Sequence, residues 1–255
     1  MSKRDELVWP QGQSCAVSLT YDDGLPVHYD LVGPLLAYYG LRGTFFVPAV
    51  SDVRVHPERW RLLARRGHEL GNHSLFHPCT RLPGREGWLE AWQDLRIYTL
   101  HRLREELATA NLILQLLDGQ SERTYGNTCC ETEVGHDDAR TSMAPVLQEL
   151  FLAARGPLNG RAVDVRRPVD LHHLGHSSGD GVTFEAIKAE IEKAAEIGGW
   201  SVWMMHGVGS DTHGLYIEPA EHEKLVQWLG TNKELAWTAP LANVAQHVVP
   251  AGVNE

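Results

Sequence analysis

The stretch Cys15-Ala-Val-Ser-Leu-Thr-Tyr-Asp-Asp-Gly24 combines the pattern of a buried strand with two adjacent carboxylates at its end. An apolar run followed by Asp-Gly is typical of a strand that ends in a turn, and such a turn needs only one aspartate. Neighbouring carboxylates repel each other unless a cation or a hydrogen-bond donor neutralises one of them. Asp22 and Asp23 therefore indicate a metal site at the end of this strand.

Two histidines further along the chain are candidate partners for that cation. His73 and His77 are four residues apart, in a segment that Gly71 and Pro78 bound. This spacing predicts a short helical turn with both imidazoles on one face, about 6 Å apart. In a chain with 14 histidines, the same pair could also be two ordinary surface residues.

One aspartate and two histidines form a facial ligand set that leaves positions open for water and substrate. Such a set is typical of a catalytic metal site, because a structural site has all its positions filled by protein ligands. Zinc fits this set best, and cobalt, nickel, manganese and iron are alternatives.

A third element is the apolar run Trp200-Ser-Val-Trp-Met-Met-His206, which is followed by Gly207. A strand that ends on a histidine places the imidazole at the same kind of strand edge as Asp22 and Asp23. Barrel enzymes hold their catalytic groups at this edge. A histidine that only caps the entry to a loop is the alternative.

Helical periodicity separates the predicted strands. Apolar residues recur at three- and four-residue intervals over residues 30–39, 58–66, 88–117 and 184–197. The alternation of strands and helices predicts an α/β fold with a mainly parallel sheet. With 255 residues the chain is long enough for one barrel-sized domain, and we expect a single domain over residues 1–255. The long pattern at 88–117 could cover a flank of the barrel or form a dimer face.

Together the motifs resemble the polysaccharide deacetylase family, the NodB-homology carbohydrate esterases of the family 4 type. The family motif T-F-D-D-G is matched by residues 20–24, H-[ST]-x-x-H by residues 73–77, and an apolar strand that ends in histidine by residues 202–206. The resemblance extends roughly over residues 9–242. It implies a distorted, incomplete (β/α) barrel of the NodB-homology type with mainly parallel strands.

The resemblance also implies a role for each motif residue. Asp23, His73 and His77 would bind the metal, and Asp22 would be the general base for the attacking water. His206 would be the general acid that protonates the leaving amine or alcohol, a task that suits imidazole near neutral pH. These roles are chemically consistent, because a metal acidifies water and polarises an acyl carbonyl.

The third family motif, an arginine followed by a proline-rich turn and a tyrosine, is only partly matched. Tyr125 is expected to present a backbone N–H to the oxyanion, and either Arg123 or Arg155 to orient the base. Trp203, beside the last motif, is a candidate substrate contact. The fourth motif is not recognisable around residues 158–167, so the motifs do not identify the substrate.

Three functions are compatible with these residues. The first is a metal-dependent hydrolase that removes N- or O-linked acetyl groups from a saccharide. The second is a cytoplasmic hydrolase of cyclic imides or other small amides. The third is a non-catalytic carbohydrate-binding protein, and the intact set of carboxylates and histidines argues against it.

Composition limits the partners and the compartment. A formal net charge of −10 and a pI near 5.8 argue against nucleic acid and anionic membranes as partners. The first ten residues lack the apolar core of a signal peptide, so we expect a cytoplasmic protein. The long pattern at 88–117 is compatible with a homo-oligomer. The cysteines have no zinc-site spacing, and adjacent cysteines rarely pair, which predicts free thiols in a reducing compartment: Cys15, Cys79, Cys129 and Cys130.

Overall fold

Seven parallel strands form a closed barrel in the computed structural model, which describes residues 9–248. Each strand pairs with the next in chain order, and the last pairs back with the first. The barrel confirms the α/β fold and the parallel strands expected from the resemblance. The strands are β1 (Cys15–Tyr21), β2 (Thr44–Val47), β3 (Glu69–Asn72), β4 (Tyr125–Gly126), β7 (Ala154–Leu158), β8 (Leu174–Ser178) and β9 (Trp200–Met205).

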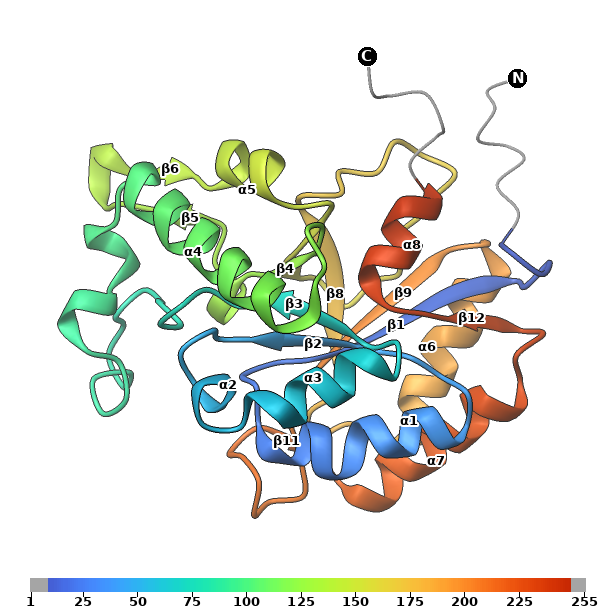
Figure 1. The fold of residues 1–255 in the computed structure, drawn as a ribbon. Helices are drawn as coiled ribbons and strands as arrows, with labels where there is room; N and C mark the ends of the chain where they lie inside the picture. Colours follow the sequence, from blue (N-terminus) through green and yellow to red (C-terminus); the bar gives the residue numbers. More distant parts are fainter. Residues whose placement is uncertain (1–8, 249–255) are drawn as a thin grey trace.

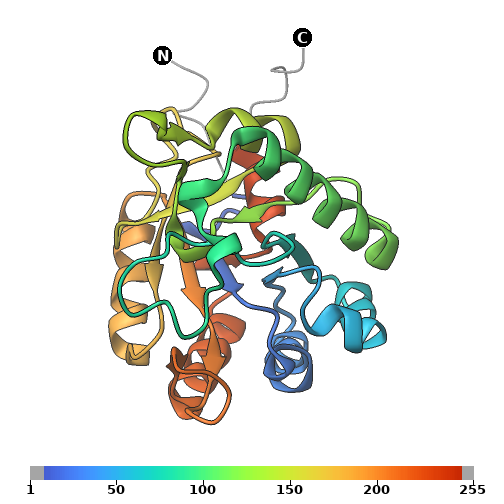
Figure 2. The same cartoon turned by 90° about the vertical axis from the view of Figure 1, so that its left-hand side faces the viewer.

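Helices surround the barrel on its outside (Figures 1 and 2). The helices α1, α3, α6 and α7 lie below the strands in Figure 1, and α4 and α5 lie above them. Three of the four expected helical segments are confirmed within a few residues. Their observed bounds are η2 (His28–Val32) with α1 (Gly33–Tyr38), α3 (Pro57–Arg65) and α6 (Phe184–Glu196), and the chain also forms α5 (Ala144–Leu150) and α7 (Pro219–Thr231).

The prediction of one helix over residues 88–117 was wrong. Only α4 (Leu100–Asp118) is a regular helix, and its start is capped by Thr99, whose side chain accepts a hydrogen bond from the backbone N–H of Arg102. Residues 88–99 instead form a loop with two single 3₁₀ turns. This loop is part of the segment that crosses the front of the strands in Figure 2. Apolar spacing alone does not separate the two parts, because the loop also buries apolar side chains.

The buried pattern of β1 explains why this stretch forms the centre of the fold. All seven of its side chains are buried. Val17 and Leu19 pack against the surrounding helices, whereas Ala16 packs with Phe46 and Val202 inside the barrel. Because side chains alternate along a strand, β1 supplies both cores at once.

A final strand and helix close the amino-terminal end of the barrel. β12 (Ala236–Thr238) pairs with the first half of β1. The backbone N–H at the start of α8 (Leu241–Val248) donates to Thr44 Oγ1 over 2.7 Å, and the next N–H donates to Glu69 Oε2 over 3.0 Å. Short elements complete the described chain: α2 (Asp52–Val55), η3 (Ala91–Gln93), η4 (Leu95–Ile97), η5 (Thr128–Cys130), β5 (Glu133–Val134), η6 (Asp137–Ala139), β6 (Thr141–Ser142), β10 (Gly207–Val208) and β11 (Tyr216–Ile217).

Two observations concern the expected compartment. None of the helices within residues 9–248 is long and apolar enough to cross a membrane. Residues 1–8, on which most of the signal-peptide argument rests, lie outside the described part of the chain.

The barrel interior is filled by Phe46, which needs two glycines as neighbours. A Cβ atom at Gly71 would lie 2.5 Å from the Phe46 ring, and one at Gly126 would lie 2.7 Å from it. Such distances are shorter than any ordinary carbon contact. Strands β3 and β4 therefore carry glycine where the ring of β2 crosses the interior.

We expect Gly71→Ala to destabilise the fold by about 1–3 kcal/mol, because the added methyl group overpacks the interior against Phe46. Urea unfolding measures the loss. The matched control is Gly87→Ala, whose Cβ would meet no heavy atom within 4 Å and which should change stability by less than about 0.5 kcal/mol. Equal effects of the two substitutions would contradict the packing argument.

Candidate active site

Asp22 lies at the carboxyl end of β1 and forms a buried ion pair with Arg155 of β7. Arg155 Nη1 donates to Asp22 Oδ1 over 2.8 Å, and its Nη2 donates to the other carboxylate oxygen. The same guanidinium donates to Thr20 Oγ1 over 2.7 Å and lies above the Phe46 ring. The carboxylate is thereby held in one orientation at the end of the barrel.

This ion pair keeps Asp22 ionised. Burial alone opposes ionisation of the carboxylate, but the Arg155 guanidinium, His73 and His206 together outweigh burial, so the pKa of Asp22 falls to about 2. His73 and His206 add smaller contributions in the same direction. At neutral pH the side chain is therefore an acceptor with both oxygens charged.

Asp23, His73 and His77 converge beside Asp22. His77 Nε2 lies 3.1 Å from Asp23 Oδ1, and His73 Nε2 lies 3.5 Å from the same oxygen. Within residues 9–248, these three side chains form one of the groups whose ligand atoms lie close enough together to hold a metal ion.

The two histidines do not lie on a helical turn, so this prediction was wrong. Strand β3 ends at Asn72, and the chain then makes a tight turn in which Ser74 has φ +67° and His77 has φ +53°. Asn72 Oδ1 accepts from the N–H of Ser74, and Ser74 Oγ accepts from the N–H of His77. These bonds compensate the unfavourable left-handed backbone and bring the two rings to 4.8 Å between centroids.

The donor atoms fit a cation. His73 Nδ1 lies 2.7 Å from the Gly126 carbonyl oxygen, which can only accept, so this nitrogen carries a proton. In the neutral ring the Nε2 lone pair then faces Asp23 Oδ1. That oxygen is buried and accepts no hydrogen bond of adequate geometry from the described residues. A lone pair and a carboxylate oxygen that face each other are stabilised by a shared positive ion.

His206 lies directly after β9 and is held by Asp180, which follows β8. Asp180 accepts from the His206 backbone N–H over 3.0 Å and from its Nδ1–H over 2.6 Å. Burial alone would lower the pKa of His206, but the Asp180 carboxylate and the charges of Asp22 and Asp23 raise it above its ordinary value. The ring therefore presents Nε2 to the site and holds its proton more strongly than an exposed histidine.

A single cavity of about 940 Å³ connects these groups. Its lining includes the two carboxylates and the three imidazoles described above, together with a second set of mostly apolar side chains. Trp88 and Trp92, both from the loop before α4, form an aromatic wall with Phe76. The Trp88 ring lies 6.1 Å from the ring of His77, and the Trp92 ring meets Phe76 edge-on at 5.1 Å.

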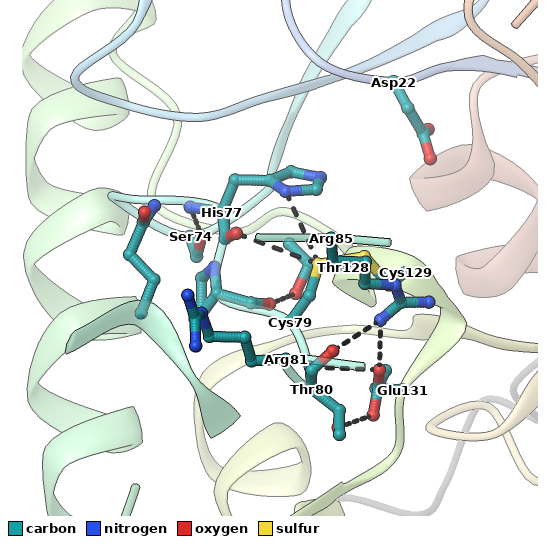
Figure 3. Close-up of a disulfide and its surroundings, with 12 residues drawn as sticks. Asp22, Ser74, His77, Cys79, Thr80, Arg81, Arg85, Thr128, Cys129 and Glu131 are labelled. Carbon is teal, nitrogen blue, oxygen red and sulfur yellow. Dashed lines mark hydrogen bonds and ion pairs between the residues drawn. A yellow bond between two sulfur atoms is a disulfide. The ribbon is translucent and has the colours of Figure 1, made fainter. Parts of the chain in front are cut away.

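A disulfide bond between Cys79 and Cys129 lies at the edge of this cavity, which Cys129 lines (Figure 3). It joins the loop after β3 to the loop after β4. Beside it, Glu131 accepts from the Thr80 N–H over 3.1 Å and from Arg85 Nη1 over 2.9 Å. Cys79 Sγ also lies 3.6 Å from His77 Nδ1.

The prediction of four free thiols was therefore wrong for Cys79 and Cys129, and it is confirmed for Cys15 and Cys130. The two bonded cysteines are 50 residues apart in sequence, and only the adjacent ends of β3 and β4 bring them together. Because two of the four cysteines form a disulfide, the cysteines do not indicate a reducing compartment.

Three residues expected in the site lie elsewhere. Tyr125 is buried beside Phe151, and its backbone N–H already donates to the Ala153 carbonyl. Trp203 is buried in the outer core, where its indole N–H donates to the Ser201 hydroxyl. Arg123, the other candidate to orient the base, pairs with Asp118 and donates to the Leu70 carbonyl on strand β3, away from the cavity lining.

Asp180 and His213 are site residues that the sequence reasoning did not assign. Asp180 follows a parallel strand at the same edge as Asp22, and that position was the signal that could have identified it. His213 lies on the loop between β10 and β11 and lines the cavity. Its place in the loop that follows His206 was the signal in the sequence for a contact with substrate, and the folded loop brings its Nε2 to 3.6 Å from Asp23 Oδ2.

Parts of the sequence are similar to known proteins. The family model described as polysaccharide deacetylase matches residues 11–128. A chitin deacetylase from Arthroderma benhamiae is 36% identical over 66 residues, which are 24% of this chain and 17% of that protein. A gellan lyase from Bacillus sp is 34% identical over 70 residues, which are 28% of this chain and 3% of that protein. The chain thus matches less than a fifth of the length of either relative.

The fold is similar to that of solved structures over nearly the whole chain. A probable polysaccharide deacetylase from Pseudomonas aeruginosa PAO1 superposes with a TM-score of 0.64 at 15% sequence identity. The superposition covers 94% of this chain and 92% of the other. At this level of identity the likeness concerns the fold.

We expect Arg155→Met to destabilise the protein by about 3–5 kcal/mol, because the substitution leaves the Asp22 charge buried and unpaired. Chemical unfolding measures the change. The control is Arg104→Met, which breaks the exposed pair with Glu149 and should cost about 0–1 kcal/mol. A loss in Arg155→Met no larger than in the control would show that the buried pair contributes little.

Proposed function

Because this chain belongs to the polysaccharide deacetylase family, we propose that it is a metal-dependent hydrolase that removes N- or O-linked acetyl groups from a saccharide. We further propose that it acts as a single catalytic domain. The main support is one arrangement: the Asp23–His73–His77 group lies between the ion-paired Asp22 and the Asp180-bound His206, in one cavity. A base, a cation site and an acid are the three parts that acyl hydrolysis by activated water requires.

In this proposal Asp22 is the general base. Its Oδ2 lies 4.0 Å from His73 Nε2, so the carboxylate is beside the cation site without being part of it. The Arg155 pair keeps the carboxylate unprotonated and oriented at every working pH. The same pair makes Asp22 a weak base, since a group with a pKa of about 2 has a low proton affinity.

Asp23, His73 and His77 would hold the divalent cation, for which zinc is our first choice. When bound, the cation supplies Lewis acidity, which polarises the acyl group and acidifies water. This acidity offsets the weakness of Asp22 as a base. The chemistry of the donor set, one carboxylate and two imidazoles, supports zinc over the harder cations magnesium and calcium.

His206 is the general acid. Asp180 holds its Nδ1–H, so the ring can deliver a proton only from Nε2, which lies 4.0 Å from Asp23 Oδ2. The proton passes to the departing nitrogen or oxygen of the saccharide as the acyl bond breaks. A raised pKa keeps the ring protonated until this step.

The aromatic wall supports a saccharide as the leaving group. Trp88 and Trp92 are 54% and 45% exposed, and both line the cavity. Large exposed indoles at a cavity mark a binding surface, and sugar rings present apolar C–H faces that pack on them.

Acetate release tests this function. The protein is stripped with a chelator, reloaded with Zn²⁺, Co²⁺ or Mn²⁺, and offered N-acetylglucosamine oligomers and O-acetylated xylo-oligosaccharides. We expect acetate from at least one saccharide, and only after metal is restored. Acetate from none of them, together with opening of a cyclic imide, would replace this proposal with imide hydrolysis.

The adjacent carboxylates provide a matched pair of variants. Asp23→Asn should lose bound metal and activity together, whereas Asp22→Asn should keep the metal and lower kcat by a factor of about 10²–10⁴. Metal content by mass spectrometry and kcat are measured on the same samples. Full turnover by Asp22→Asn would disprove the assignment of the base.

The pH profile tests the acid. Protonated His206 is the active form, so kcat falls as pH rises through its pKa. Asp180→Asn removes the carboxylate that raises this pKa, and we expect the alkaline limb of the profile to move to lower pH. His206→Ala serves as the control, because it should lower kcat by about 10²–10⁴ and abolish that limb. An unmoved limb in Asp180→Asn would mean that another group titrates.

A further inference from the structure

The loop between β10 and β11 is built to hold one imidazole in the cavity. The Gly207 N–H donates to the Leu215 carbonyl over 3.0 Å, and the Gly209 N–H donates to the Ile217 carbonyl over 3.0 Å. Within the loop, the Thr212 N–H donates to the Gly209 carbonyl. These bonds fix both ends of the segment that presents His213.

The loop also packs against the chain immediately after His206. A Cβ atom at Gly207 would lie 2.4 Å from Thr212 Oγ1 and 2.9 Å from His213 Cβ. Only glycine leaves room for so close an approach. The position of His213 is therefore set by packing as well as by hydrogen bonds.

His213 forms a parallel pair with His206. The two rings lie 5.3 Å apart with an angle of 13° between their planes. His213 Nε2 lies 3.6 Å from Asp23 Oδ2, and His206 Nε2 lies 4.0 Å from the same oxygen. Both nitrogens therefore reach the region between the cation site and the cavity mouth.

Backbone groups of Leu215 hold the Nδ1 edge of His213. The Leu215 N–H lies 3.1 Å from His213 Nδ1, and the Leu215 carbonyl oxygen lies 3.0 Å from the same nitrogen. The other ring nitrogen, Nε2, faces the Asp23 carboxylate at 3.6 Å, and this acceptor favours a proton on Nε2. In that tautomer Nδ1 accepts from the Leu215 N–H, and His213 offers an Nε2–H donor to the cavity, next to His206.

We infer that His213 binds the substrate through an Nε2–H hydrogen bond to an oxygen of the leaving group, on the carbon next to the acetylated position. This inference rests on the proposed function, since it assigns His213 to the saccharide side of the same reaction. The substrate class it selects carries a hydroxyl beside the acetylated carbon, as sugar rings do. A simple alkyl amide or ester lacks this acceptor.

Two substitutions test the Nε2–H donor and the aromatic ring of His213 independently of each other. His213→Phe keeps an aromatic ring against His206 but has no N–H, and His213→Gln keeps a donor of similar reach without the ring. The substrates are the panel saccharide with the highest acetate release and its analogue without the neighbouring hydroxyl. Wild-type protein should prefer the full saccharide by about tenfold in kcat/KM, the worth of one neutral hydrogen bond.

His213→Phe should lose this preference, with about a tenfold lower kcat/KM on the full saccharide and little change on the analogue. His213→Gln should retain most of the preference. His136→Ala, an exposed histidine on another loop, should behave as wild type. Equal losses of His213→Phe on both substrates, or a loss of bound metal, would overturn the inference in favour of a structural or metal-binding role.

A binding measurement gives a second readout. In Asp22→Asn protein, whose turnover should be slower by a factor of about 10²–10⁴, calorimetry of the same saccharide should give a Kd about tenfold weaker when His213→Phe is added. If wild-type protein releases acetate but neither Kd nor the preference changes, this inference fails and the proposed function stands. If wild-type protein releases acetate from no saccharide, the proposed function fails and the inference falls with it.

Discussion

The buried ion pair between Asp22 and Arg155 is the interaction on which the site depends. Strands β1 and β7 are not neighbours in the sheet, so the pair spans the barrel interior. Removing either charge would leave the other unpaired away from water, at a cost of several kcal/mol. The guanidinium rests on the Phe46 ring at 4.9 Å, and that ring fits only because Gly71 and Gly126 have no side chains. Each of these groups thus packs against the next, from the two glycines through the Phe46 ring and the Arg155 guanidinium to the Asp22 carboxylate.

Sequence reasoning predicted the parts of the fold that local patterns encode. Strands β1 and β9 are mostly apolar in sequence, and the polar residue that follows each strand lies at the carboxyl edge shared by parallel strands. This argument placed Asp22 and His206 together across 184 residues of sequence. It did not choose between Arg123 and Arg155, because a two-residue strand such as β4 gives no periodicity from which side-chain direction follows. The structure has Arg155 inside the barrel and Arg123 outside the cavity.

Contacts between loops could not be predicted from local sequence patterns. A spacing of four predicted a helical turn for the two histidines, but the side chains of Asn72 and Ser74 stabilise a left-handed turn that brings the imidazoles together by another route. The bond from Cys79 to Cys129 requires that the loops after β3 and β4 be adjacent, which is a property of the sheet order. Nothing local distinguishes Cys129 from its neighbour Cys130 as the bonded partner.

One backbone angle explains how two adjacent aspartates come to lie in different surroundings. Successive side chains of a strand point to opposite faces, yet both Asp22 and Asp23 line the cavity. Asp23 has φ +74°, which ends the alternation and turns its carboxylate back toward the site. Gly24 follows with φ +62°, where an added Cβ would lie 2.9 Å from Val47. The first carboxylate then meets a guanidinium and the second meets imidazoles, so their surroundings, and not their residue type, distinguish the proposed base from the proposed metal ligand.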